Sequence, residues 1–350
     1  MRVAVASLRF APGHVAHLRA YRELFLDLGC EVGLFLDQGY DGFIDSAENV
    51  YFINGISDIL EWKPDSILSY NIANENITLA RQCRKKEIKF FYVLHEPWFG
   101  LKDTLALGRR MPRRIAANVV NYLTSHYACK VILASENGKQ NYLTHMKHCN
   151  KCYAVFPLIF CDDYDTSKDL ERKYFSFIGG FTEPRACSAY LDFVRHALSN
   201  NLDYRFCIAT RNPIDGYLTD AVLQNAIKER KLVVFAGRPM TSEEINQHYR
   251  EAICTWNAYK MSTQSGVLPN ALMQGTPVLV TDRGDSAGII SDKREGCFVS
   301  LPHENKEIQQ AFEYISKHVD EMSRAARDTF HKDYEYKVYL NKAKEVYEIK

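Results

Sequence analysis

A loop, a short helix and a buried strand follow one another between residues 262 and 282, and polar groups gather where the helix begins. The pattern predicts a helix that starts at Ser265, Gly266 and Val267 and ends at Gly275. The first amides of a helix have no partner inside it and lie at the positive end of its dipole, so they can bind a diphosphate. An ordinary helix–strand unit has the same pattern, so both interpretations stay open at this point.

A second group of polar residues follows the predicted strands of the first half. His95 and Glu96 come directly after a buried apolar run, at the carboxyl end of a strand. Ligands of open parallel sheets bind at that edge, where such a pair can act as general acid or base. His14 and His17, beside Gly13 in the turn after the first strand, are expected on the same side, facing an acceptor or a phosphate. A single histidine is more often structural, so His95 keeps both interpretations.

These residues must be positioned by a regular alternation of short apolar runs and helix-length segments, which predicts parallel sheets covered on both faces. Strands are expected at 2–7, 31–36, 65–69, 88–94, 130–134 and 153–156, and again at 174–178, 204–208, 232–235, 252–256 and 277–280. A polar stretch at 161–168 interrupts the alternation. We therefore expect a first domain at 1–157, a linker at 158–172, a second domain at 173–325 and a C-terminal helical segment at 326–350.

Length and charge agree with this organisation and exclude other classes of protein. A chain of 350 residues is longer than one hydrophobic core usually organises. The 44 Lys and Arg residues against 43 acidic ones give a net charge of +1, which argues against duplex nucleic acid as the partner. No apolar run reaches the roughly 18 residues of a membrane span, and no signal peptide is recognisable. With ten cysteines expected as reduced thiols, the sequence predicts a cytoplasmic protein.

Several motifs of the second half occur in one fixed order: Phe235-Ala236-Gly237, a helix that ends with Tyr249 to Ala252, and the block from Ala271 to Val278. This order resembles the nucleotide-binding half of GT-B-fold glycosyltransferases, in particular the large retaining family numbered four. The first half is similar to the same family at Pro12-Gly13-His14, at Leu94-His95-Glu96 and at Ala134-Ser135-Glu136.

The resemblance implies a GT-B fold, in which two Rossmann-like α/β domains face each other across a cleft. The first domain would bind the acceptor and the second the nucleotide sugar. The C-terminal helix would pack back on the first domain.

The chain departs from the family at two glutamates that the family has eight positions apart. Ser262 and Asn270 stand in their places. In such enzymes the second glutamate holds the ribose hydroxyls, a role that the amide of Asn270 can fill. The first contacts the donor sugar; Ser262 can form a hydrogen bond there but supplies no charge. The donor sugar and the stereochemical outcome therefore stay open.

In the place of the family's phosphate-binding block, Gly180 replaces the arginine and Arg185 stands in for the lysine. A guanidinium fork suits a diphosphate, whereas a solvent-facing arginine at the start of a helix is the alternative. Arg238 is a further candidate near the base or the phosphates. The remaining expected donor-binding residues are Ser262, Gln264, Ser265, Gly266, Val267 and Asn270.

Residues 102–121 mix basic and apolar side chains, with arginines at Arg109, Arg110, Arg113 and Arg114. Such a stretch can lie on an anionic membrane surface, or it can be a solvated face with a core stripe.

Two possible metal motifs are discounted. Asp163-Tyr164-Asp165 spells D-x-D but falls in the linker, and the group that ends in Cys149 and Cys152 lacks a second cysteine pair. We expect no metal and no cofactor, with the nucleotide sugar as co-substrate.

Together these features predict a metal-independent and retaining glycosyltransferase. It would move a sugar from a nucleoside diphosphate sugar, with UDP favoured, to a glycan or lipid-linked acceptor in surface polysaccharide or lipopolysaccharide assembly. A nucleotide-sugar epimerase of the same fold and a non-catalytic homologue are the alternatives.

Overall fold

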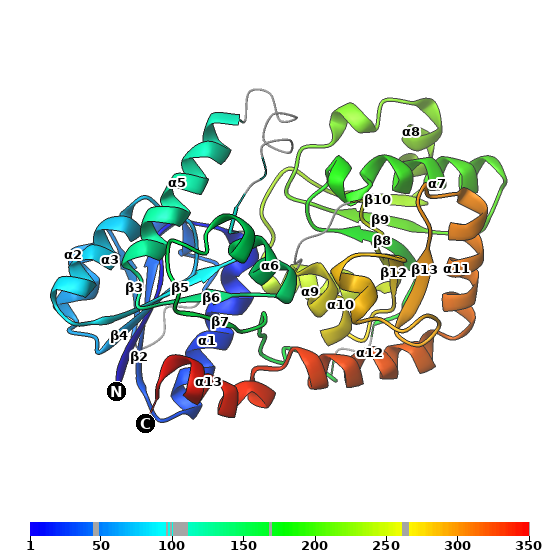
Figure 1. Cartoon of the computed structure of the whole chain (residues 1–350). Helices are drawn as coiled ribbons and strands as arrows, with labels where there is room; N and C mark the ends of the chain where they lie inside the picture. The colour runs from blue at the N-terminus through cyan, green and yellow to red at the C-terminus, as the bar shows by residue number, and fades with distance from the viewer. Residues whose placement is uncertain are drawn as a thin grey trace. The chain divides into compact units, whose positions relative to one another are not determined.

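The computed structural model describes residues 1–44, 49–95, 97–98, 100, 111–167, 170–260 and 266–349. The chain divides into two compact units, and each contains one parallel sheet between layers of helices (Figure 1). Unit 1 comprises Met1–Cys161 and Glu335–Lys350, and unit 2 comprises Asp162–Tyr334. The first change of unit falls inside the predicted linker 158–172, and the second falls inside the predicted C-terminal segment 326–350.

Unit 1 has a seven-stranded sheet in the order β3-β2-β1-β4-β5-β6-β7, and its strand pairs are parallel. The strands are β1 (Arg2–Ser7), β2 (Glu31–Asp37), β3 (Val50–Ile53), β4 (Ser66–Ser69), β5 (Lys89–Leu94), β6 (Lys130–Leu133) and β7 (Tyr153–Val155). Its helices are α1 (Val15–Asp27), α2 (Ile56–Glu61), α3 (Glu75–Lys85), α5 (Met111–Tyr127), α6 (Glu136–His145) and α13 (Leu340–Tyr347).

The two faces of this sheet carry separate cores. Side chains of α1 and α13 pack with one face, and side chains of α2, α3 and α6 pack with the other. Because both faces are covered, the central strands are largely buried and mostly apolar; β1 buries every residue after Arg2.

Unit 2 has a six-stranded parallel sheet in the order β10-β9-β8-β11-β12-β13. The strands are β8 (Tyr174–Ile178), β9 (Phe206–Ala209), β10 (Leu232–Phe235), β11 (Ala252–Asn257), β12 (Val278–Thr281) and β13 (Gly296–Val299). Its helices are α7 (Cys187–Ser199), α8 (Ala221–Lys228), α9 (Ser242–Arg250), α10 (Val267–Met273), α11 (Asn305–Lys317) and α12 (Val319–Asp333).

Local sequence signals fix where several of these helices begin and end. The hydroxyl of Thr241 accepts from the amide of Glu244, whose carboxylate accepts from the amide of Thr241, so α9 starts with a capping box. Gly275 follows α10 with a φ of +60°, a left-handed conformation that favours glycine, and so ends the helix where the sequence predicts it.

The C-terminal segment is not one continuous helix. After α12 the helix is interrupted at Tyr334 and Glu335, and Glu335 forms an isolated β-bridge with Phe160. The chain then continues through a 3₁₀ helix (Tyr336–Tyr339) into α13. Tyr347 of α13 is buried among the aromatic rings of Phe25, Phe91 and Phe156. The last helix therefore belongs to the core of unit 1.

Replacing Tyr347 with alanine should lower the free energy of unfolding of unit 1 by about 3–5 kcal/mol, because a large buried ring is lost and a cavity remains. Hydrogen exchange of peptides from α1 and β5 would measure this loss. The exposed Glu345 of the same helix provides the control, and Glu345→Ala should leave exchange unchanged. Equal exchange in both variants would contradict a core role for α13.

Candidate active site

The carboxyl ends of the unit 1 strands bring three histidines and one tyrosine together. The ring of His95, which follows β5, lies 5.5 Å from the ring of His14 and 6.3 Å from that of His17. Tyr70, which follows β4, lies 4.8 Å from His95 and 5.1 Å from His14. The predicted residues His14, His17 and His95 thus form one cluster, and Gly13 lies in the exposed turn just before it.

Tyr70 was missed by the sequence analysis. The only signal for it is its place directly after the apolar run of β4, where an aromatic hydroxyl faces the ligand-binding edge of a sheet. The buried hydroxyl of Tyr70 and Nε2 of His95 have no hydrogen-bond partner among the residues that the structure describes. Buried polar atoms are normally paired, so these two are available to a polar ligand.

Burial keeps the imidazoles of His17 and His95 neutral. It lowers the pKa of His17 to about 3, with the neighbouring charge of His14 adding to the effect and the hydrogen bond to the Ile159 carbonyl opposing it. Burial, followed by the charges of His14 and His17, also lowers the pKa of His95 well below its usual value. A neutral His95 is a weak base, so the geometry suits hydrogen bonding to a hydroxyl group better than proton transfer.

In unit 2, the loop after β8 meets the beginning of α10. A Cβ atom at Gly179 would lie 2.8 Å from Nη1 of Arg185 and 3.0 Å from Cγ2 of Val267, so a side chain at this position would displace the guanidinium. The φ of Gly179, +108°, is the feature that favours glycine here. A Cβ at Gly180 would lie 3.6 Å from the same Nη1. The structure therefore brings Gly180, Arg185 and Val267 together.

The electrostatics of this arrangement favour an anion. The guanidinium of Arg185 stands beside the amino end of α10, which is the positive end of the helix dipole. It lies over the ring of Tyr259 at 5.2 Å, and no carboxylate among the described residues forms an ion pair with it. Two positive groups without an intervening anion repel each other, so their proximity indicates a site for a negatively charged ligand.

Two further residues that the sequence analysis missed support this loop. The side-chain oxygen of Asn212 accepts from the amide of Phe181 at 2.9 Å and from the hydroxyl of Thr210 at 3.2 Å. The indole of Trp256 donates to the carbonyl of Arg185 at 3.0 Å. Asn212 is 31 residues from Phe181 and Trp256 is 71 residues from Arg185, so no local sequence pattern reveals these two contacts.

Other predicted donor-binding residues have different surroundings. Gly266 precedes α10 as its N-cap, and Asn270 lies half-buried one turn later. Arg238 is exposed, and its guanidinium is occupied by both carboxylate oxygens of Glu244. Ser262, Gln264, Ser265, Glu96, Arg109 and Arg110 lie outside the residues that the structure describes.

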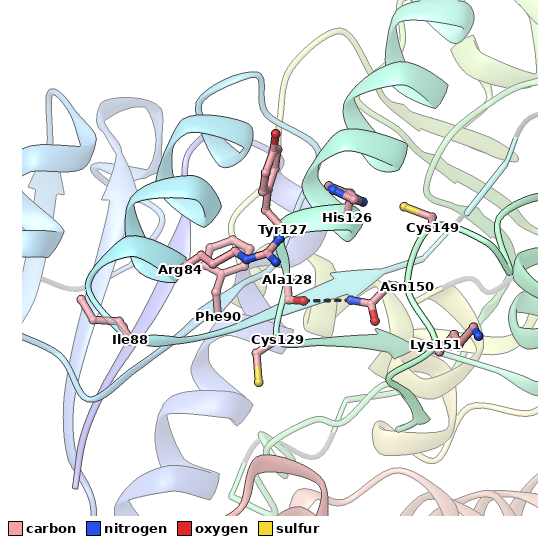
Figure 2. Close-up of a pocket in the computed structure, with 10 residues that line it drawn as sticks. All are labelled: Arg84, Ile88, Phe90, His126, Tyr127, Ala128, Cys129, Cys149, Asn150 and Lys151. Carbon is pink, nitrogen blue, oxygen red and sulfur yellow. Dashed lines mark hydrogen bonds between the residues drawn. The ribbon is translucent and has the colours of Figure 1, made fainter.

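The opposite edge of the unit 1 sheet holds a cavity of about 420 Å³, lined by Arg84, Phe90, His126 and Lys151 among others (Figure 2). It opens where β5 and β6 begin, and none of the predicted site residues lines it. The amide of Asn150 in its wall already donates to the carbonyls of Ser125 and Ala128. This cavity is therefore separate from the candidate site.

Comparison with solved structures identifies the fold. HepE of Anabaena, solved in complex with UDP, gives a TM-score of 0.71 at 11% identity, covering 99% of this chain and 100% of that chain. Sucrose-phosphate synthase of Thermosynechococcus elongatus gives 0.70 at 12% identity, covering 99% and 98%. WaaG, a glycosyltransferase involved in lipopolysaccharide biosynthesis, gives 0.68 at 11% identity, covering 99% and 99%. The predicted fold class is confirmed: this is a GT-B fold of two Rossmann-like units.

The second unit also matches a family model. Residues 172–318 match the model of the family described as "Glycosyl transferases group 1". This match agrees with the resemblance that the second half of the sequence shows to that class of enzyme. No curated protein matches it by sequence.

Acid should destabilise unit 1 through the buried histidines. The pKa of His17 is about 3 in the folded chain and near the ordinary 6.5 when unfolded, so the unfolded chain binds more protons below pH 6.5. The free energy of unfolding then falls as the pH drops from about 6.5 towards about 3, and the share of His17 at pH 5 is about 2 kcal/mol.

Urea unfolding at about pH 7.5 and about pH 5 measures this loss. His17→Gln should reduce the difference between the two by about 2 kcal/mol, whereas His126→Gln, at an exposed position, should not. The same pH dependence in wild type and His17→Gln would contradict the assignment.

Proposed function

We propose that this glycosyltransferase moves a sugar from a nucleoside diphosphate sugar, preferably a UDP-sugar, to a glycan or lipid-linked oligosaccharide acceptor. The observation that carries the proposal is the approach of Arg185 and the amino end of α10 to the Gly179–Gly180 loop. Two positive groups at this spacing suit a diphosphate. The preference for UDP rests on HepE and on the pneumococcal O-GlcNAc transferase GtfA, both solved with UDP.

In the proposed reaction, the bond between the anomeric carbon and the β-phosphate oxygen breaks, and a bond to an acceptor hydroxyl oxygen forms. The hydroxyl proton goes to the departing phosphate. Negative charge grows on the diphosphate as it leaves, and Arg185 together with the amino end of α10 at Gly266 and Val267 would stabilise that charge. These groups supply the positive charge that a divalent metal provides elsewhere, so the proposed mechanism needs no metal.

The remaining roles are proposed as follows. Asn270 would hold the ribose through its amide, and Ser262, Gln264 and Ser265 would complete the donor site. The neutral His95 would orient the sugar or the acceptor through hydrogen bonds, and Glu96, the next residue in the sequence, is proposed to act with it. The acceptor would meet the edge of unit 1 at Gly13, His14 and His17. A retained anomeric configuration is part of the proposal through the family resemblance.

Replacing Arg185 with alanine should weaken UDP binding by at least about tenfold, since a charge-assisted hydrogen bond contributes about 1.5–3 kcal/mol. Calorimetric titration with UDP, with and without a chelator, measures this change. Arg195→Ala is the matched control, because Arg195 lies on α7 and pairs with Asp192 and Asp220 on the surface. Wild-type affinity in Arg185→Ala would remove Arg185 from the diphosphate site.

We also propose that the enzyme works in surface polysaccharide or lipopolysaccharide assembly, in the cytoplasm at the inner face of the membrane. No helix among the described residues is long and apolar enough to cross a bilayer. Helix α5, however, exposes a row of apolar side chains: Ile115 and Val119 are about half exposed, and Tyr122 and Leu123 more than a third. Their spacing puts them on one face of the helix.

The charge of α5 complements an anionic lipid surface. Its 17 residues contain no aspartate or glutamate, and Arg113 and Arg114 lie in its first turn. An amphipathic helix with an apolar face and basic side chains binds the interface of a bilayer that contains anionic lipids. Arg109 and Arg110 would add to the same surface.

Changing Ile115, Val119 and Leu123 together to serine should reduce binding to phosphatidylglycerol vesicles by at least about tenfold, because the apolar area that enters the interface is lost. Cosedimentation measures the bound fraction. The control exchanges Val222 and Val338 for serine, since these are similarly exposed on other segments. Equal binding by the two variants, or no binding by wild type, would contradict the membrane proposal.

A further inference from the structure

The chain crosses between the two units twice, after Cys161 and after Tyr334. Asp162 is the first residue of unit 2, and α12 leads to its last. Any movement of one unit relative to the other must bend the chain at these two places, because no other covalent link joins them. Residues that hold the two crossings together therefore control such movement.

Arg327 connects the two crossings. It lies on α12, which leads to the second crossing, and it binds Asp162, the first residue after the first crossing. Its Nη1 donates to Oδ1 of Asp162 at 2.8 Å, and its Nη2 donates to Oδ2 at 2.6 Å. The guanidinium also lies over the ring of Tyr164 at 4.5 Å. Burial acts to raise the pKa of Asp162, but the hydrogen bonds and charge of Arg327 outweigh it and the pKa is lowered. Asp162 is therefore ionised at neutral pH.

The same guanidinium reaches the end of α10. Nη1 of Arg327 donates to the carbonyl of Met273, the last residue of that helix. A Cβ atom at Gly275 would lie 3.3 Å from Cγ of Arg327 and 3.3 Å from the carbonyl oxygen of Ser323, so the end of α10 packs directly on α12. A cation at the carboxyl end of a helix also stabilises its dipole.

Helix α10 is fixed at both ends. Nη2 of Arg172 donates to the carbonyls of Gln274 at 3.0 Å and Gly275 at 2.8 Å, immediately after the helix. At the other end, the hydroxyl of the buried Tyr249 donates to the carbonyl of Val267 at 3.3 Å. Helix α10 has only seven residues and is hydrogen-bonded to its surroundings at both ends. If it moves, it moves as one rigid body, so a displacement at Val267 is passed on to Met273.

We propose that Arg327 is a positioning residue that couples the donor-binding end of α10 to both crossings of the chain. The inference rests on the proposed function, which places the diphosphate at the amino end of α10. Occupation of that end changes the position of α10, and Arg327 transmits the change to Asp162 and to α12. Donor binding and movement between the units are thereby linked in free energy.

Hydrogen exchange of the full chain with and without UDP tests the coupling. In wild type, UDP should slow exchange at Gly179–Phe181 and, by at least about threefold, at 162–167 and 319–334. Arg327→Gln should keep the first protection and a UDP affinity within about threefold of wild type, because Arg327 does not touch the donor end. The variant should lose the UDP-dependent slowing of exchange at 162–167 and 319–334.

Asp162→Asn should have the same effect, and the double variant should add little, because the two residues form one pair. Arg324→Gln, at an exposed position on α12, should behave as wild type. A merely structural role would speed exchange with and without UDP but leave the UDP-dependent difference intact, and that result would overturn the proposal. If Arg327→Gln does not fold, the hydrogen exchange of Asp162→Asn with and without UDP tests the proposal in its place.

The two proposals fail in different ways. If wild type does not bind UDP, the proposed function is wrong and the coupling falls with it. If wild type binds UDP and protects the crossings, and both variants keep that protection, the donor site stands and Arg327 has no coupling role.

Discussion

The parallel pairing of the strands in both sheets carries each turn that follows a strand to the same edge of its sheet. In unit 1 this constraint places Tyr70 and His95, from neighbouring strands, within 4.8 Å of each other. In unit 2 it places the loop after β8 beside the helix that follows β11. The polar residues of each candidate site therefore gather at one edge of the sheet, while the separate cavity of Figure 2 lies at the opposite edge of the unit 1 sheet.

Within unit 2, two of the three arginines around α10 interact favourably with the dipole of the helix, and the third interacts unfavourably. Arg172 and Arg327 bind carbonyls at its negative end, where a cation is stabilising. Arg185 stands at the positive end, where a cation is unfavourable unless an anion shares the site. The first two explain why this short helix is stable, and the third explains what it would bind. Arg238 has a carboxylate partner already and contributes to the start of α9 instead.

Much of the candidate site could be predicted because its residues lie in local patterns. Gly180 and Arg185 follow a buried strand, and Gly266 and Val267 precede a short helix ended by glycine, so their element assignments needed no tertiary information. Asn212, Tyr259 and Tyr70 could not be predicted in the same way. Each owes its place to a contact with a segment far away in the sequence, and nothing in its own neighbourhood signals that contact.

The sequence by itself determined the class of protein, since alternating apolar runs and helix signals require parallel sheets, and the order of motifs in the second half indicated a glycosyltransferase. It missed the strands β3 and β13, and it treated the C-terminal segment as one helix. Tertiary structure decided the rest. Burial sets the neutral state of His17 and His95, and the pairing of Arg327 with Asp162 joins residues 165 positions apart. Desolvation and long-range pairing arise only when the chain is folded, because they depend on which segments exclude water from one another.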